Sequence, residues 1–189
     1  RAGERLQLIG QETGEPNEVT VRGLQSRGQQ SEVLEPVSRA ALNLRGMPAA
    51  EVHRGDALIS ADWWTTDTVD VRWASGGALD EGSEHITVHI GTAAIGARLR
   101  PFDADHARLQ LSRPLPLQLG DRMVLRDSGA KMVVAGVQVL DLDPPALTRR
   151  GAGHRRAEAL AELPAGGSVA AEVTRRQAVR VETLRRFGF

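Results

Sequence analysis

Residues 19–60 read VTVRGLQSRGQQSEVLEPVSRAALNLRGMPAAEVHRGDALIS, and this stretch decides the fold. Apolar and polar residues alternate at positions 20–22 and 41–44, which is the period of a half-buried strand. The glycines at positions 23, 28, 46 and 55 are predicted to mark turns. Residues 48–52 are expected to form one short helical turn. Strand, loop, strand, turn, strand is the order of an antiparallel β-barrel.

The composition fits one large or two small globular domains. The chain has 189 residues, of which 41% are hydrophobic and only 3% aromatic. Leu, Val, Ile and Ala must therefore form the core. With no Cys there is no disulfide framework and no thiolate metal site, as is typical of a cytoplasmic protein. No apolar run approaches the roughly 20 residues of a membrane span, so we expect no membrane association.

A second run of alternating residues follows a polar joint at residues 60–67. Six short strands at regular spacing predict a second barrel, which ends at the consecutive prolines Pro144 and Pro145. These strands are expected at residues 69–73, 86–90, 93–101, 108–111, 122–126 and 131–140. Trp63 and Trp64 in the joint could pack two domains together or could stack on a nucleic-acid base.

From residue 146 the pattern becomes helical. A first helix is expected at residues 155–163 and a second after Ser168, whose side chain can cap it. Apolar residues recur at three- to four-residue spacing, apart from one longer gap, and predict one buried face with most arginines lying off it. These are Val169, Val173, Val181, Leu184 and Phe187. Residues 148–189 hold nine Arg and four Glu in a chain of net charge 0. This basic tail indicates either nucleic-acid binding or a solvated helix face.

The order of these pieces resembles the second and third domains of translational GTPases of the elongation factor Tu type. It is most similar to the selenocysteine-specific elongation factor family. Residues 2–9, 21–26, 39–46 and 51–58 resemble the second domain, and residues 89–93, 109–116, 120–127 and 133–145 the third. The family usually has Ala-Gly-Asp or Ala-Gly-Gln before the motif arginine, where this chain has Pro36-Val37-Ser38.

The resemblance implies a mainly β fold. We expect two translation-factor-type antiparallel β-barrels, the first incomplete, followed by a short α-helical segment. The expected parts are residues 1–61 from the second domain, residues 62–145 as the third domain, and residues 146–189. This last part looks like the opening of the winged-helix region that binds messenger RNA in the family. The strands that close the first barrel lie upstream in the family, so either the chain is a fragment of a longer protein or its missing strands come from elsewhere.

The resemblance also implies a function in translation. The partners would be selenocysteinyl-tRNA and, through the parent protein, messenger RNA and the ribosome. GTP and Mg²⁺ would bind in an N-terminal domain absent from this chain. The pattern G-x-x-x-x-G-K-[ST] does not occur, so we assign no catalytic residue and no cofactor here. A structural or protein-interaction module derived from elongation factors, or an RNA-binding module driven by the Arg-rich tail, remains an alternative.

Three arginines are the candidate aminoacyl- and tRNA-binding residues, namely Arg22, Arg39 and Arg45. By resemblance Arg39 falls on the motif arginine near the pocket for the aminoacyl group. A selenol has a lower pKa than a thiol, so a selenocysteine side chain is an anion at neutral pH. A guanidinium stays protonated and suits such an anion. The alternative is a strand arginine paired with a neighbouring carboxylate.

The histidines and aspartates of the second run are not expected to bind a metal. His85 and His89 share a face of a strand, but four residues of strand span about 13 Å, too far to share one zinc ion. Asp103, Asp105 and His106 are expected to lie in a hairpin turn, where Asp binds its own backbone.

Overall fold

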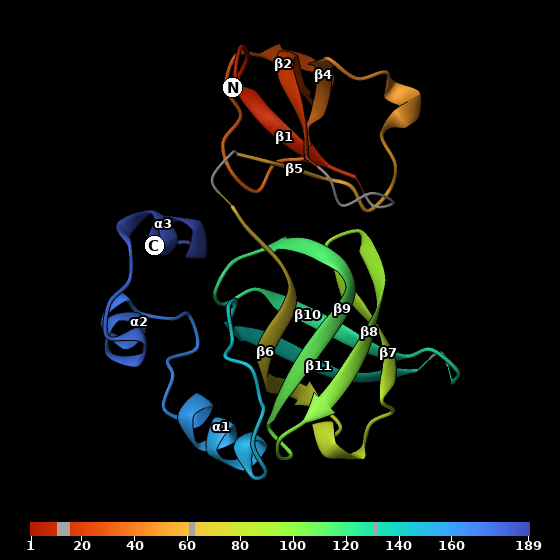
Figure 1. Cartoon of the computed structure of the whole chain (residues 1–189). Coiled ribbons are helices and arrows are strands. Elements are labelled where there is room, and N and C mark those ends of the chain that lie inside the picture. Colours follow the sequence, from red (N-terminus) through yellow and green to blue (C-terminus); the bar gives the residue numbers. More distant parts are fainter. Residues whose placement is uncertain (11–15, 61–62, 131) are drawn as a thin grey trace. The chain divides into compact units, whose positions relative to one another are not determined.

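The structure is a computed structural model that describes residues 1–10, 16–60, 63–130 and 132–189. The chain divides into two compact units, Arg1–Ala61 and Asp62–Phe189 (Figure 1). The first is an open antiparallel sheet, and the second is a closed barrel with three helices on its outside.

The first unit is a half-barrel of five strands. Strands β3, β2, β1 and β5 lie side by side in that order, and β4 also pairs with β2. The apolar residues that alternate along β1 and β2 are buried, including Leu8, Val19 and Val21. This incomplete barrel confirms the expected fold. Its elements are β1 (Arg5–Ile9), β2 (Pro16–Ser26), β3 (Gln29–Ser31), β4 (Ala41–Arg45), a 3-10 turn η1 (Ala49–Glu51) and β5 (Ala57–Ile59).

One of the four expected glycine turns is wrong. Gly28, Gly46 and Gly55 have positive φ angles outside the strands, as turns require. Gly23 instead lies inside β2, which continues to Ser26. The pairing with β4 shifts register between Val21 and Gly23, so Arg22 is the extra residue of a β-bulge. A strand glycine often marks a bulge because the chain bends there.

The second unit contains the predicted second barrel. Its six strands close in the order β10-β11-β6-β9-β8-β7 (Figure 1). Inward residues such as Val71, Leu109 and Leu125 are fully buried. The elements are β6 (Trp64–Gly76), a 3-10 turn η2 (Leu79–Glu81), β7 (His85–Ile90), β8 (Ala93–Pro101), β9 (His106–Leu117), β10 (Arg122–Asp127) and β11 (Val133–Asp141).

Two expected boundaries in this unit were wrong. The polar joint extends only to Trp63, because β6 begins at Trp64, and residues 61–62 lie outside the described chain. Strand β9 runs to Leu117, although prolines follow residue 111. Next to these prolines, the pairing of β9 with β6 shifts register between Thr66 and Thr68 of β6. Position 131, expected to open β11, is also outside the described residues.

Three helices follow the barrel within the same unit. They are α1 (Ala152–Ala161), α2 (Val169–Arg176) and α3 (Val181–Phe187), drawn in blue in Figure 1. The Ser168 side chain accepts a hydrogen bond from the Ala171 N–H at 3.0 Å, which confirms the predicted cap. No helix in the described part of the chain is long and apolar enough to cross a membrane.

The expected apolar face of the tail is wrong at its three valines, although Leu184 is half-buried. The chain breaks at Gln177, whose φ is +63°, so the residues before and after it belong to different helices. Val169, Val173 and Val181 are 45%, 41% and 58% exposed, whereas Phe187 is buried. Helix α2 therefore packs on the barrel by another face.

Candidate nucleic-acid interface

Arg22 and Arg45 lie on the exposed surface of the first unit. Arg22 is the bulged residue of β2, and Arg45 ends β4 directly opposite Thr20. Both side chains are exposed, while the neighbouring Val21 points into the core. Arg22 also lines an open pocket of about 570 Å³ with Gln25. These two side chains are therefore accessible to a partner.

Arg39 lies in the loop before β4 rather than in a strand. Its carbonyl accepts a hydrogen bond from the Ser26 hydroxyl at 2.9 Å, which ties the loop to the end of β2. Its exposed side chain lines an open pocket of about 490 Å³ together with Arg27. No ion pair to Arg39 is found among the described residues. Arg45 is not among the residues that line this pocket.

The loop before Arg39 has a strained backbone at Val37. Its φ is +61°, in the left-handed region that β-branched residues rarely adopt. Val37 stands where the family usually has glycine, and its side chain is fully exposed. The Ser38 hydroxyl donates to the Glu35 carbonyl at 2.7 Å, which holds the chain across Val37. The chain thus keeps a glycine-type turn next to Arg39 without the glycine.

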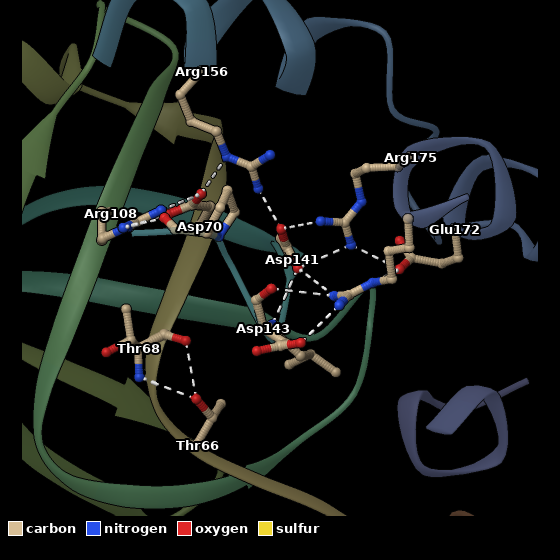
Figure 2. A network of polar contacts seen from close by, with 12 residues as sticks. Thr66, Thr68, Asp70, Arg108, Asp141, Asp143, Arg156, Glu172 and Arg175 are labelled. Atoms are coloured by element: carbon tan, nitrogen blue, oxygen red, sulfur yellow. Dashed lines mark hydrogen bonds and ion pairs between the residues drawn. The ribbon is translucent and has the colours of Figure 1, made fainter. Parts of the chain in front are cut away.

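A second group of polar residues, in the second unit, was missed by the sequence reasoning. Its centre is a pair of carboxylates, Asp70 on β6 and Asp141 at the end of β11, both 0% exposed. Asp70 accepts hydrogen bonds from Arg108 Nε at 2.7 Å and Nη2 at 3.0 Å, and from Arg156 Nε at 2.6 Å. Figure 2 shows Arg108 and Arg156 converging on Asp70. The α1 arginine thus binds an acidic group of the barrel.

Asp141 binds arginines from two helices. Arg156 of α1 and Arg175 of α2 both form ion pairs with it (Figure 2). The Nη2 atom of Arg176 lies 3.3 Å from the Asp141 Oδ1 atom. Glu172, also buried, accepts from Arg175 at 2.7 Å and from Arg176 at 3.0 Å. These arginines of the tail therefore form the contact with the barrel.

Arg176 remains fully charged in this position. Burial alone lowers the pKa of its guanidinium. Hydrogen bonds to Asp143 and Glu172 and the attraction of Asp141 outweigh burial and raise that pKa above its usual value. The Asp143 contact is 2.6 Å long.

Arg72 of β6 fixes the other end of α1. Its Nη2 donates to the carbonyls of Leu160 at 2.7 Å and Leu163 at 2.8 Å. Leu160 lies in the last turn of α1, and Leu163 lies just beyond its end. A cation is favourable there because the C-terminal end of a helix carries partial negative charge. Helix α1 is thus held to the barrel at its middle and at its end.

A weak sequence signal for this group existed. Asp70 stands between Val69 and Val71 in the predicted strand at residues 69–73, where alternation puts its side chain on the opposite face from theirs. Alternation gives no information about what covers an outer face. Here Arg156 of α1 covers it, 86 residues later in the chain.

Trp64 is not available as a free base-stacking platform. Its Nε1 donates to the Leu142 carbonyl at 2.9 Å, and its ring meets Phe187 edge-to-face at 5.0 Å. The Arg186 guanidinium lies 4.8 Å from the centre of the same ring. These contacts anchor α3 within the second unit. Whether Trp63 and Trp64 also pack two domains together stays a prediction.

The expected hairpin turn before β9 is confirmed at Asp103. Its carboxylate accepts hydrogen bonds from the Asp105 N–H at 2.9 Å and the His106 N–H at 2.6 Å. Burial alone raises the pKa of this carboxyl, but the hydrogen bonds, first from the His106 side chain, hold it below its usual value. His106 itself begins β9 and is buried. Among the described residues, no three His, Asp or Glu side chains are grouped as a metal site requires.

Known proteins match this chain in sequence. Residues 66–146 match the β-barrel domain of the selenocysteine-specific elongation factor. The selenocysteine-specific elongation factor of Escherichia coli (strain K12) is 30% identical over 155 residues, covering 80% of this chain. That of Desulfomicrobium baculatum is 29% identical over 153 residues, covering 75%. The chain spans 24% of the length of each of these curated relatives.

Solved structures match the fold. A bacterial selenocysteine-specific elongation factor superposes with a TM-score of 0.75 at 17% identity, over 99% of this chain and 30% of that one. The apo form of translation elongation factor SelB from Methanococcus maripaludis gives 0.61 at 14% identity, over 77% and 38%. A half-barrel followed by a closed barrel is thus the fold that this chain shares with these two elongation-factor structures. With the sequence matches, the chain belongs to the selenocysteine-specific elongation factor family.

Proposed function

We propose that this chain is the part of a selenocysteine-specific elongation factor that binds the aminoacyl end of selenocysteinyl-tRNA. The observation that carries the proposal is the environment of Arg39. Its guanidinium is exposed, lines a pocket with Arg27, and has no acidic partner among the described residues. An arginine paired within the fold would already be neutralised, whereas this one is left to bind an anion.

Arg22 and Arg45 are proposed to contact the tRNA backbone. Both are exposed on the same sheet and are separate from the Arg39 pocket. Phosphate contacts of this type position a nucleic acid without distinguishing what is attached to its end. Because Arg22 and Arg45 are assigned to the tRNA backbone and Arg39 to the aminoacyl group, we expect only Arg39 of the three to affect which aminoacyl group is bound.

GTP and Mg²⁺ are proposed to bind the parent protein outside this chain. The phosphate-loop pattern is absent from the sequence, and the described residues contain no acidic cluster that fits a metal. We further propose that residues 146–189 begin the winged-helix region, through which the parent reaches messenger RNA and the ribosome in the cytoplasm.

The test compares two ligands on the full-length parent with Arg39→Ala. We expect its affinity for selenocysteinyl-tRNA to fall about ten- to a hundredfold, because a charge-assisted hydrogen bond contributes roughly 1.5–3 kcal/mol. Affinity for the same tRNA carrying serine should change much less. Both are measured at one salt concentration, since phosphate contacts depend strongly on salt.

Two variants serve as controls. Arg54→Ala removes an exposed arginine of the same unit and should leave both affinities unchanged. Arg45→Ala should weaken both ligands alike. Equal losses for the two ligands with Arg39→Ala, or no loss, would show that the side-chain pocket lies elsewhere.

A further inference from the structure

Helix α2 meets the barrel by its charged face. Glu172 is buried, and Arg175 and Arg176 are largely covered, whereas Val169 and Val173 are exposed. A surface helix normally buries its apolar stripe. The position of α2 is therefore set by ion pairs rather than by burial of apolar side chains.

The two buried carboxylates make this attachment cooperative. Arg156 contacts both Asp70 and Asp141, and Arg175 contacts Asp141 from the next helix. Removing one partner of a buried pair leaves an uncompensated charge, which is strongly destabilising. Because α1 and α2 share the Asp141 carboxylate, detaching either helix disturbs the other.

We infer that this cluster, here called the carboxylate clamp, is a positioning device that holds α1 and α2 at one place on the barrel. The clamp consists of Asp70, Arg108, Asp141, Arg156, Glu172, Arg175 and Arg176. It makes the helical segment part of the barrel's rigid body instead of a flexible linker. Exposed arginines of α1, such as Arg155, are thereby held at fixed positions on the second unit.

Hydrogen exchange of the whole chain tests the clamp. Asp141→Asn keeps the shape of the side chain and removes its charge, and Arg175→Gln replaces the guanidinium with a shorter, neutral side chain. Each should speed exchange of the α2 amides, Val169–Arg176, by about tenfold or more. Exchange in β7 and β8, away from the clamp, should stay unchanged. In the double variant the effects should be less than multiplicative, because both changes remove the same interaction.

Matched controls distinguish the clamp from attachment by apolar contacts or by surface charge. Arg180→Gln removes one charge from an exposed arginine for which the described residues offer no ion pair, and should have no effect. Val173→Ser alters the exposed apolar face of α2 and should also leave its exchange unchanged. Raising salt to about 1 M, where charges are screened beyond roughly 3 Å, should not release α2 because the pairs are buried.

The opposite results would overturn the inference. Unchanged α2 exchange in Asp141→Asn, or release of α2 by Val173→Ser, would show that apolar contacts hold the segment. If Asp141→Asn does not fold, Arg176→Gln gives the same readout at the less buried Asp143 contact. The exchange experiment contains no tRNA, so its outcome is independent of the function proposed for Arg39.

Discussion

Val37 has a strained backbone conformation and lies next to the proposed aminoacyl site. A β-branched residue with φ near +61° crowds its own backbone, and the fully exposed side chain gains no burial in return. Strain of this kind persists where the surrounding structure determines the conformation, and it often occurs in ligand-binding loops. Here the hydroxyls of Ser26 and Ser38 hold the loop.

Replacing Val37 with Asn should stabilise the first unit by about 1 kcal/mol, because Asn adopts the left-handed conformation more readily. Hydrogen exchange of the β2 and β4 amides measures the effect, since all three Trp lie in the second unit. Val33→Asn is the control: Val33 is also exposed but lacks a positive φ, so its replacement should change little. Equal effects at both positions would argue against strain at Val37.

Single residues were predictable where the local chain alone decides their conformation. Ser168 caps α2 because its hydroxyl lies within reach of a free N–H of the first turn. Gly23 was misassigned because a bulge depends on the partner strand, β4, which local sequence does not show. Arg39 was recognised by resemblance, but its loop position and its neighbour Arg27 needed the structure.

At the scale of elements, β6 and β11 approach closely at Gly76. Its φ is +90°, and a Cβ there would lie 2.7 Å from the Val134 carbonyl oxygen and 2.9 Å from the Ala135 Cα. Both contacts are to backbone, so the strands themselves would have to move. Glycine is required at this point of the barrel.

Gly76→Ala should therefore lower the free energy of unfolding of the second unit by about 2–4 kcal/mol. Urea denaturation followed by tryptophan fluorescence measures it, with Trp73 on the same strand. Gly96→Ala in β8 is the control, since its Cβ would meet nothing nearer than 3.8 Å and its φ is not positive. We expect its effect to stay below about 1 kcal/mol. A similar loss at both sites would contradict the steric argument.

A strand or helix was predictable where a single spacing of apolar residues runs along its whole length. Strand β8 alternates buried and exposed residues over nearly its whole length, and both its ends match the expected residues 93–101. The face of α2 was wrong because periodicity identifies the apolar residues but not the surface a helix meets. Two buried carboxylates from distant strands, Asp70 and Asp141, made the charged face the better fit.

At the scale of the molecule, some of the basic residues of the C-terminal tail are paired with carboxylates inside the second unit. Of the nine arginines in residues 148–189, Arg156, Arg175 and Arg176 bind carboxylates of the second unit. The exposed tail keeps six Arg against three Glu. Counting charges along the sequence therefore overstated how much of the tail is available to RNA. This weakens the alternative of a tail-driven RNA-binding module.

The two units differ in how completely they bury their apolar surface. The second has a closed barrel, which has no free strand edges, and its core is filled. The first is an open sheet that leaves Val33, Leu42 and Val52 exposed. Open edges and exposed apolar side chains favour association with other chains.

We therefore expect the units to behave differently when produced separately. Residues 62–189 should unfold cooperatively in urea, with the same tryptophan-detected midpoint as the whole chain, because the closed barrel and the carboxylate clamp lie entirely within them. Residues 1–61 should associate or remain loosely folded, since a small open sheet buries too little apolar surface to be stable alone.

Analytical ultracentrifugation and amide exchange distinguish these outcomes. A monomeric first unit with strongly protected β1 and β2 amides would show that the half-barrel is self-sufficient. A lowered midpoint for residues 62–189 would show that the barrel needs the first unit.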